Sequence, residues 1–150
     1  MHIAEGVLSA PVLITGAVVA AGAVAYGLKK LDPRQVMMAA ILGAAFFVAS
    51  LIHIPVGPSS VHLLLNGLLG VLLGWSAVPV IFVGLLLQAI LYGFGGLTVL
   101  GVNTATMGLG AVLSWYIFGG LLSVLKPLGA KKAAAVSGFV SGACGVAIAA

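Results

Sequence analysis

Residues 8–28 read LSAPVLITGAVVAAGAVAYGL, and the six residues that follow, 29–34, read KKLDPR. The first stretch carries no charged side chain and matches the roughly 20 apolar residues with which an α-helix crosses the hydrocarbon core of a bilayer. A backbone in lipid must satisfy its own hydrogen bonds, and the alternating pattern of a barrel strand is missing. The stretch therefore predicts a transmembrane helix that ends at a basic loop.

The same pattern recurs along the rest of the chain, in four stretches of spanning length and a shorter fifth: 36–52, 77–91, 107–125, 133–150 and the shorter 61–73. The 150 residues are 63% hydrophobic and only 5% charged, against about 25% in an ordinary soluble domain. This composition excludes a water-soluble globule. We expect an all-α, polytopic membrane bundle of at least six transmembrane helices, forming one integral membrane domain over residues 1–150.

The few charges predict how this bundle is oriented. A signal peptide has cations before its apolar run, whereas here Glu5 precedes the run and the cations follow it, so the first span is retained. The positive-inside rule places the loop 29–34 in the cytoplasm, and alternating spans bring Lys126, Lys131 and Lys132 to the same side. The N-terminus and all three histidines then lie outside a cell membrane, and the net charge of +4 marks orientation rather than nucleic-acid binding.

Small residues and the last span give two further expectations. Glycine occurs 22 times, about twice its average share of ~7%, as is typical of helices that pack closely in lipid. The small-x-x-x-small pairs Ala21/Ala25 and Gly138/Gly142 are examples of such packing surfaces. The last span reaches Ala150 without a polar exit or interfacial aromatic, which predicts a chain truncated at its C-terminus.

The first two residues could hold a metal ion. Histidine is too large to permit trimming of the initiator methionine, so the free amine of Met1 stays next to the imidazole of His2. The amine, the His2 backbone nitrogen and the His2 Nδ1 can close two fused chelate rings around one ion. Planar nitrogen coordination suits Ni²⁺ and Cu²⁺, with Co²⁺ a plausible relative, and not Mg²⁺ or Ca²⁺.

Such a site needs a fourth nitrogen, and the candidates His53 and His62 bracket the sequence HIPVGPSSVH. The prolines and glycine of this stretch break any helix, and its serines are good N-caps for a helix that begins near Val61. His62 would then lie in the first helical turn and share a face with Asn66. The short helix that follows is consistent with a re-entrant outer loop lining a cavity.

Other polar residues can be interpreted either as part of a site or as part of the helix packing. Glu5 either orients the free ring N–H of His2 or favours the dipole of the first helix. Gln88 is more simply explained by an interhelical hydrogen bond than by a site. The glycine-rich loop 92–106, which contains Asn103, is too long for a simple turn and is predicted to fold inward as a lid or cavity wall.

Two families of chemistry are excluded by what the sequence lacks. There is no Gly-x-x-x-x-Gly-Lys loop for nucleotide, so energy for uphill transport must come from elsewhere. The two acids, Glu5 and Asp32, fall on opposite faces of the bilayer, which leaves no Ser-His-Asp set and no catalytic residue to assign. A membrane metalloenzyme or redox subunit, with His53 and His62 holding a catalytic metal, remains the alternative, and a purely structural subunit is a third.

The chain resembles the CbiM/NikM family of substrate-binding membrane subunits of energy-coupling-factor transporters for cobalt and nickel. The resemblance rests on MHIAEG at 1–6, HIPVGPSSVH at 53–62, GGL at 95–97 and GVN at 101–103. It implies that the Met1 amine and His2 are metal ligands and that His62, rather than His53, is the histidine of the family's Ser-x-His motif. Two departures stand out, because Phe94 and Thr106 stand where many members have Asp and a second Asn.

The resemblance also implies function and partners. It points to a transport subunit rather than an enzyme, with Ni²⁺ or Co²⁺ as the transported substrate and no resident cofactor. The implied partners are a transmembrane coupling subunit, cytosolic ABC ATPases and a small accessory membrane subunit. In this interpretation Met1, His2 and His62 hold the metal, and Glu5, His53, Asn66 and Asn103 support the site.

Overall fold

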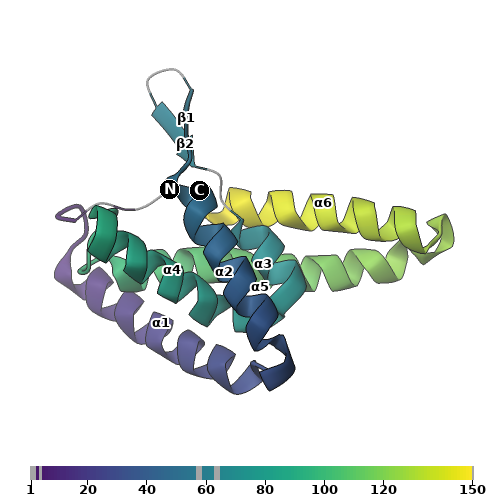
Figure 1. Cartoon of the computed structure of the whole chain (residues 1–150), viewed down its shortest axis with the longest axis horizontal. Helices are drawn as coiled ribbons and strands as arrows, with labels where there is room; N and C mark the ends of the chain where they lie inside the picture. The colour runs from purple at the N-terminus through teal and green to yellow at the C-terminus, as the bar shows by residue number, and fades with distance from the viewer. Residues whose placement is uncertain (1–2, 4, 57–58, 63–64, 150) are drawn as a thin grey trace.

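A computed structural model describes residues 3, 5–56, 59–62 and 65–149, with the backbone alone described at 53–56, 59–62 and 128. Six α-helices, three short 3-10 helices and one β-hairpin make up this part of the chain (Figure 1). In order they are α1 (Ala10–Lys30), η1 (Pro33–Gln35), α2 (Val36–Leu51), β1 (His53–Val56), β2 (Ser59–His62), α3 (Asn66–Leu73), η2 (Gly74–Ser76), α4 (Ala77–Tyr92), α5 (Leu100–Val124), η3 (Lys126–Leu128) and α6 (Ala130–Ala149).

The helix ends follow from local sequence. Proline lies in the first turn of α1, where its missing N–H costs nothing, and Lys29 and Lys30 end the helix where cations interact favourably with its dipole. The Asp32 carboxylate accepts the Arg34 N–H at 2.8 Å and so caps η1. Helix α4 ends at Tyr92 and is capped by Gly93, whose φ of +67° is a left-handed conformation that glycine adopts without strain.

Five segments of the described chain are long and apolar enough to cross a membrane, so the protein is a membrane protein and the helical prediction is confirmed for them. The expectation of at least six spans is not met among these residues, because α3 has only 8 residues and continues through η2 into α4. Gly74, with φ +57°, makes the break between the two helices. The stretch Asn66–Tyr92 thus counts as one span of 27 residues.

The segment between α2 and α3 differs from its prediction. Ser59–His62 is a β-strand paired antiparallel with His53–Val56, so the helix expected to begin near Val61 is absent there and α3 begins at Asn66. The prolines and glycine do exclude a helix, as predicted, but strand pairing rather than serine capping satisfies the backbone. A re-entrant loop is not confirmed, since Figure 1 shows β1 and β2 extending away from the helices.

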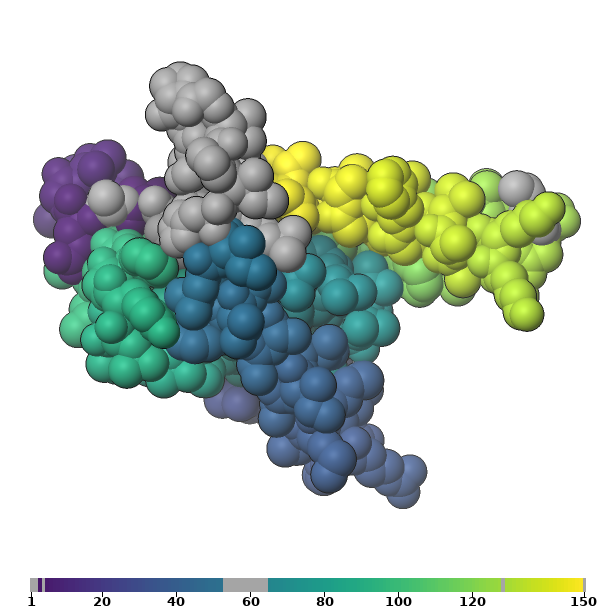
Figure 2. All heavy atoms as spheres, turned by 45° about the horizontal axis from the view of Figure 1, so that its top comes forward, coloured from purple at the N-terminus to yellow at the C-terminus, as the bar shows by residue number. Residues whose placement is uncertain are grey.

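Helix α5 lies at the centre of the bundle and packs against α1, α3, α4 and α6. Its buried Met107 contributes to a core that also includes Phe46 of α2, Leu69 of α3 and Ile81 of α4. The far ends of α5 and α6 continue together beyond the other helices (Figures 1 and 2). The N-terminal end of α5, by contrast, meets the N-terminal segment, and this contact positions the candidate site.

Glycine allows the closest helix contacts, as the composition predicts. A Cβ at Gly70 would overlap the Ala111 carbonyl, and one at Gly67 would lie 2.5 Å from the Gly142 carbonyl oxygen. Of the two small-residue pairs, Gly142 therefore packs inside the molecule, whereas Ala21 and Ala25 are exposed on α1.

Candidate metal-binding site

The N-terminal segment is tied to α5 through the backbone of Ile3. The Ile3 N–H donates to Asn103 Oδ1 at 2.9 Å, and Asn103 Nδ2 donates to the Ile3 carbonyl at 3.3 Å. Asn103 is 2% exposed, so both halves of its amide are used in a largely desolvated position. One buried side chain thus fixes the backbone that directly follows His2.

A second tie joins Glu5 to the loop between α4 and α5. One oxygen of the Glu5 carboxylate accepts the Thr98 N–H at 3.1 Å and the Thr98 hydroxyl at 3.0 Å. The Thr98 backbone N–H and then its hydroxyl lower the pKa of the Glu5 carboxyl below its usual value, because hydrogen bonds to the charged form favour it. Figure 2 shows this N-terminal segment, in purple, lying against the green part of the chain.

The α4–α5 loop is shorter than predicted. It covers residues 93–99, because α5 begins at Leu100 and includes Asn103 and Thr106. Three glycines of this loop have positive φ, and Gly96, at +102°, lies so close to Glu5 that a Cβ would overlap the carboxyl group. The loop supports the N-terminal segment instead of forming the long lid that its composition suggested.

His53 and His62 occupy paired positions. They are the last pair of the β1–β2 ladder on the side of α2 and α3, directly opposite one another in the antiparallel register. The structure therefore brings the two backbones together, which the sequence argument did not anticipate. His62 does not lie in a helical turn, and the shared helical face predicted for His62 and Asn66 is wrong.

Asn66 and Gln88 both face other helices. Asn66 begins α3, is fully buried and donates from Nδ2 to the Gly145 carbonyl of α6 at 3.1 Å. Gln88 Nε2 donates to the hydroxyl of Ser50 on α2, which confirms the prediction of an interhelical hydrogen bond. Gln88 is therefore part of the helix packing.

Met1 and His2 lie outside the residues that the structure describes. Among the described ones, no three His, Cys, Asp or Glu side chains gather into a possible metal site. The predicted ligand set therefore remains a prediction. The structure adds three residues, Asn103, Thr98 and Gly96, that contact the segment following His2.

Sequence reasoning missed Thr98 and the role of the Ile3 backbone. Both belong to hydrogen bonds between residues more than 90 positions apart, for which a single sequence contains no periodic signal. The cluster of glycines at 93, 95 and 96 was the available signal. Glycines in a loop are typical of turns with positive φ and of places where another segment approaches closely, and at Gly96 that segment contains Glu5.

Replacing Gly96 with Ala tests this contact. We expect Gly96→Ala to lower the free energy of unfolding by about 1–3 kcal/mol, because a non-glycine residue is held at positive φ and Glu5 must move. Thermal unfolding in detergent measures the loss. Gly93→Ala is the matched control, since Gly93 has φ +67° but a Cβ there would meet no atom within 4 Å. In a Glu5→Ala background the Gly96→Ala cost should shrink; an unchanged cost would show that the two residues do not interact.

With the geometry established, the chain can be compared with known proteins. Residues 2–150 match the CbiM family model, described as a cobalt uptake substrate-specific transmembrane region. A relative from Haemophilus influenzae, whose name assigns it to metal transport, is 46% identical over 97% of this chain and 69% of its own length. The fused nickel transport protein NikMN of Rhodobacter capsulatus is 38% identical over 71% of this chain and 33% of that protein.

The cobalt transport protein CbiM 1 of Pelobacter propionicus is 42% identical over 73% of this chain, which spans 52% of that protein. Two solved structures, one of a transition metal transporter and one of a truncated transition metal transporter, superpose with TM-scores of 0.71 and 0.72 at 26% identity. The alignments cover 99% of this chain and 68% and 72% of those chains. On the family match and these relatives, the chain belongs to the CbiM family of cobalt uptake substrate-specific transmembrane regions.

Proposed function

We propose that this protein is the substrate-binding membrane component of a nickel or cobalt transporter of the energy-coupling-factor type. It captures Ni²⁺ or Co²⁺ outside the cell in a buried site of nitrogen ligands. The ligands are the Met1 amine, the backbone nitrogen and imidazole of His2, and the imidazole of His62. The named functions of the relatives, nickel and cobalt transport, support this substrate class.

The paired hydrogen bonds between Ile3 and Asn103 are the observation that carries the proposal. When the backbone after the N-terminal dipeptide is held in one conformation, the three nitrogens of the dipeptide lose less conformational entropy on closing chelate rings around an ion. Asn103 binds Ile3, the residue that follows His2. Thr98 binds the carboxylate of Glu5, two residues further along the chain. The contacts of Ile3 and Glu5 thus supply preorganisation that favours chelation by the N-terminus.

The transport cycle needs partners. A transmembrane coupling subunit, cytosolic ABC ATPases and a small accessory membrane subunit supply ATP-driven reorientation, since the chain has no nucleotide loop of its own. The N-terminus faces outward in the cell membrane and the basic loops face the cytoplasm. Because the amine and the His2 backbone amide must lose protons to coordinate, metal affinity falls in acid.

Substitution of the two histidines tests the ligand assignment. His62→Ala should weaken Ni²⁺ and Co²⁺ binding by more than 100-fold, beyond the roughly 10–100-fold typical of residues that only support a ligand. His53→Ala should cost less, because His53 is assigned a supporting role. Calorimetric titration of purified protein with Ni²⁺ and Co²⁺ measures both. The opposite ranking would overturn the choice of His62, and full binding by both variants would exclude both histidines as ligands.

A further inference from the structure

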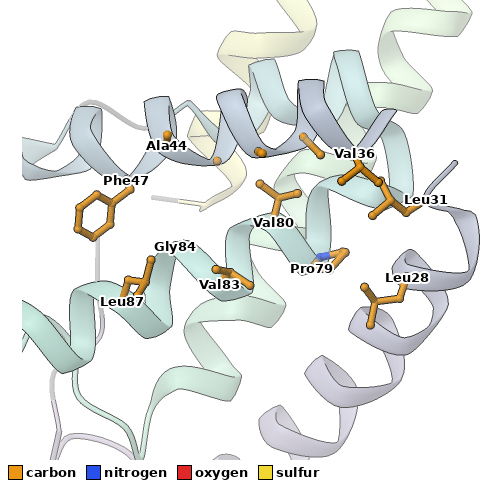
Figure 3. Close-up of a pocket in the computed structure, with 13 residues that line it drawn as sticks. Leu28, Leu31, Val36, Ala44, Phe47, Pro79, Val80, Val83, Gly84 and Leu87 are labelled. Carbon is orange, nitrogen blue, oxygen red and sulfur yellow. The ribbon is translucent and has the colours of Figure 1, made fainter. Parts of the chain in front are cut away.

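An apolar groove of about 500 Å³ runs between α2 and α4 and is closed at one end by the last residues of α1. Figure 3 shows side chains of α2 and α4 facing one another across it, with Leu28 and Leu31 at one end and Phe47 at the other. Small or compact residues lie deepest, since Ala39 and Pro79 are buried. The groove is therefore a surface channel between two helices of the bundle.

The length of the groove matches one leaflet of a bilayer. Its lining on α2 runs from Val36 to Phe47, which is about 16 Å at roughly 1.5 Å per residue. Half of a hydrocarbon core of about 30 Å is about 15 Å. Because α1 and α2 are both membrane spans joined by the loop at 31–35, the Val36 end lies at a membrane surface. The Phe47 end lies four residues before Leu51, where α2 ends, and beside Tyr92, the last residue of α4.

The two ends of the groove differ in charge. Exposed Lys29, Lys30 and Arg34 flank the Leu28, Leu31 and Val36 end, against a single carboxylate, Asp32. The Asp32 carboxylate already accepts a hydrogen bond from the Arg34 N–H at 2.8 Å.

One of these cations has a partner. Lys30 Nζ lies 5.5 Å from the centroid of the Tyr26 ring, a cation–π contact. Lys29 and Arg34 are therefore the basic groups available at the groove mouth. At the opposite end, Phe47 contacts the Tyr92 ring at 6.1 Å between centroids, and no charged residue lines the groove.

We infer that this groove is a binding site for one acyl chain of an anionic phospholipid, whose phosphate is held by Lys29 and Arg34. An amphiphile with a negative head and a tail one leaflet long is complementary to a groove with a basic mouth and an apolar interior. A neutral lipid would leave the basic mouth unused.

Native mass spectrometry of the purified full chain tests this site with dipalmitoyl phosphatidylglycerol, against dipalmitoyl phosphatidylcholine. We expect tighter binding of phosphatidylglycerol, and we expect Lys29→Gln with Arg34→Gln to remove about 30-fold of its affinity, since each cation near a membrane surface contributes about fivefold. Lys131→Gln with Lys132→Gln removes the same charge from α6 and should leave binding unchanged. Equal affinity for both lipids, or an equal loss in the α6 variant, would overturn the proposal.

Filling the groove gives an independent second test. Ala44→Leu places a larger side chain among the lining residues and should weaken both lipids several-fold, whereas Ala45→Leu, exposed on α2 but outside the groove, should not. Ala40→Leu serves if Ala44→Leu fails to fold. Inorganic phosphate should not displace phosphatidylglycerol. Displacement by phosphate, or unchanged lipid binding in both filled variants, would show that the acyl chain does not occupy the groove.

Discussion

Adding Gly-Ser before Met1 is expected to reduce the affinity for Ni²⁺ and Co²⁺ by at least about 100-fold, more than the loss of a supporting residue causes. The extension turns the Met1 amine into an amide nitrogen, which is far harder to deprotonate. It also moves the new amine two residues away from His2. Since Asn103 fixes Ile3, the extended chain cannot slide inward to compensate.

The measurement is a metal titration of protein purified without any N-terminal tag, alongside the extended variant. The control places the same Gly-Ser after Ala150, at the other end of the chain, and should bind metal normally. Equal thermal stability of the two proteins in detergent would show that the extension acts on the site. Normal metal binding by the N-terminally extended protein would exclude the Met1 amine as a ligand and favour a site built on histidines alone.

The membrane-crossing helices were predictable because lipid leaves the backbone few options. Long uncharged stretches must be helical in a bilayer, and the predicted span at 77–91 differs from α4, Ala77–Tyr92, by one residue. The start of α5 was placed at Met107 instead of Leu100, because Gly101, Asn103 and Thr104 suggested a loop. Asn103 and Thr104 are buried and Gly101 packs closely against Ala17 of α1, so these residues form helix in spite of their low propensity.

The support of the candidate site was predictable only in part. The sequence singled out Glu5 and Asn103 as supports of the site, Glu5 beside His2 and Asn103 in the loop predicted to fold inward. Their partners, Thr98 and the Ile3 backbone, depend on how α5 packs beneath the N-terminal segment, and composition does not determine that. The hairpin could not be predicted for a related reason. Its residues are compatible both with the N-cap of a helix and with a pair of strands. In the structure His53 pairs with His62 and the stretch forms strands.

Asn103→Leu is expected to raise the dissociation constants for Ni²⁺ and Co²⁺ by about 10–100-fold, the range found when residues that orient metal ligands are lost. Leucine has a similar shape but cannot accept the Ile3 N–H or donate to the Ile3 carbonyl. With both backbone groups left unpaired, the N-terminal segment loses its fixed position. The free energy of unfolding should also fall, by about 1–3 kcal/mol.

Thr104→Val is the matched control on the next residue of α5. Thr104 is fully buried, and its hydroxyl has no hydrogen-bond partner among the residues that the structure describes. Replacing an unpaired hydroxyl by a methyl group of the same shape should leave stability unchanged or slightly raised, and metal affinity unchanged. If Asn103→Leu lowered stability but kept full metal affinity, the Ile3 contact would serve folding alone, and the N-terminal segment would not need to be held for metal to bind.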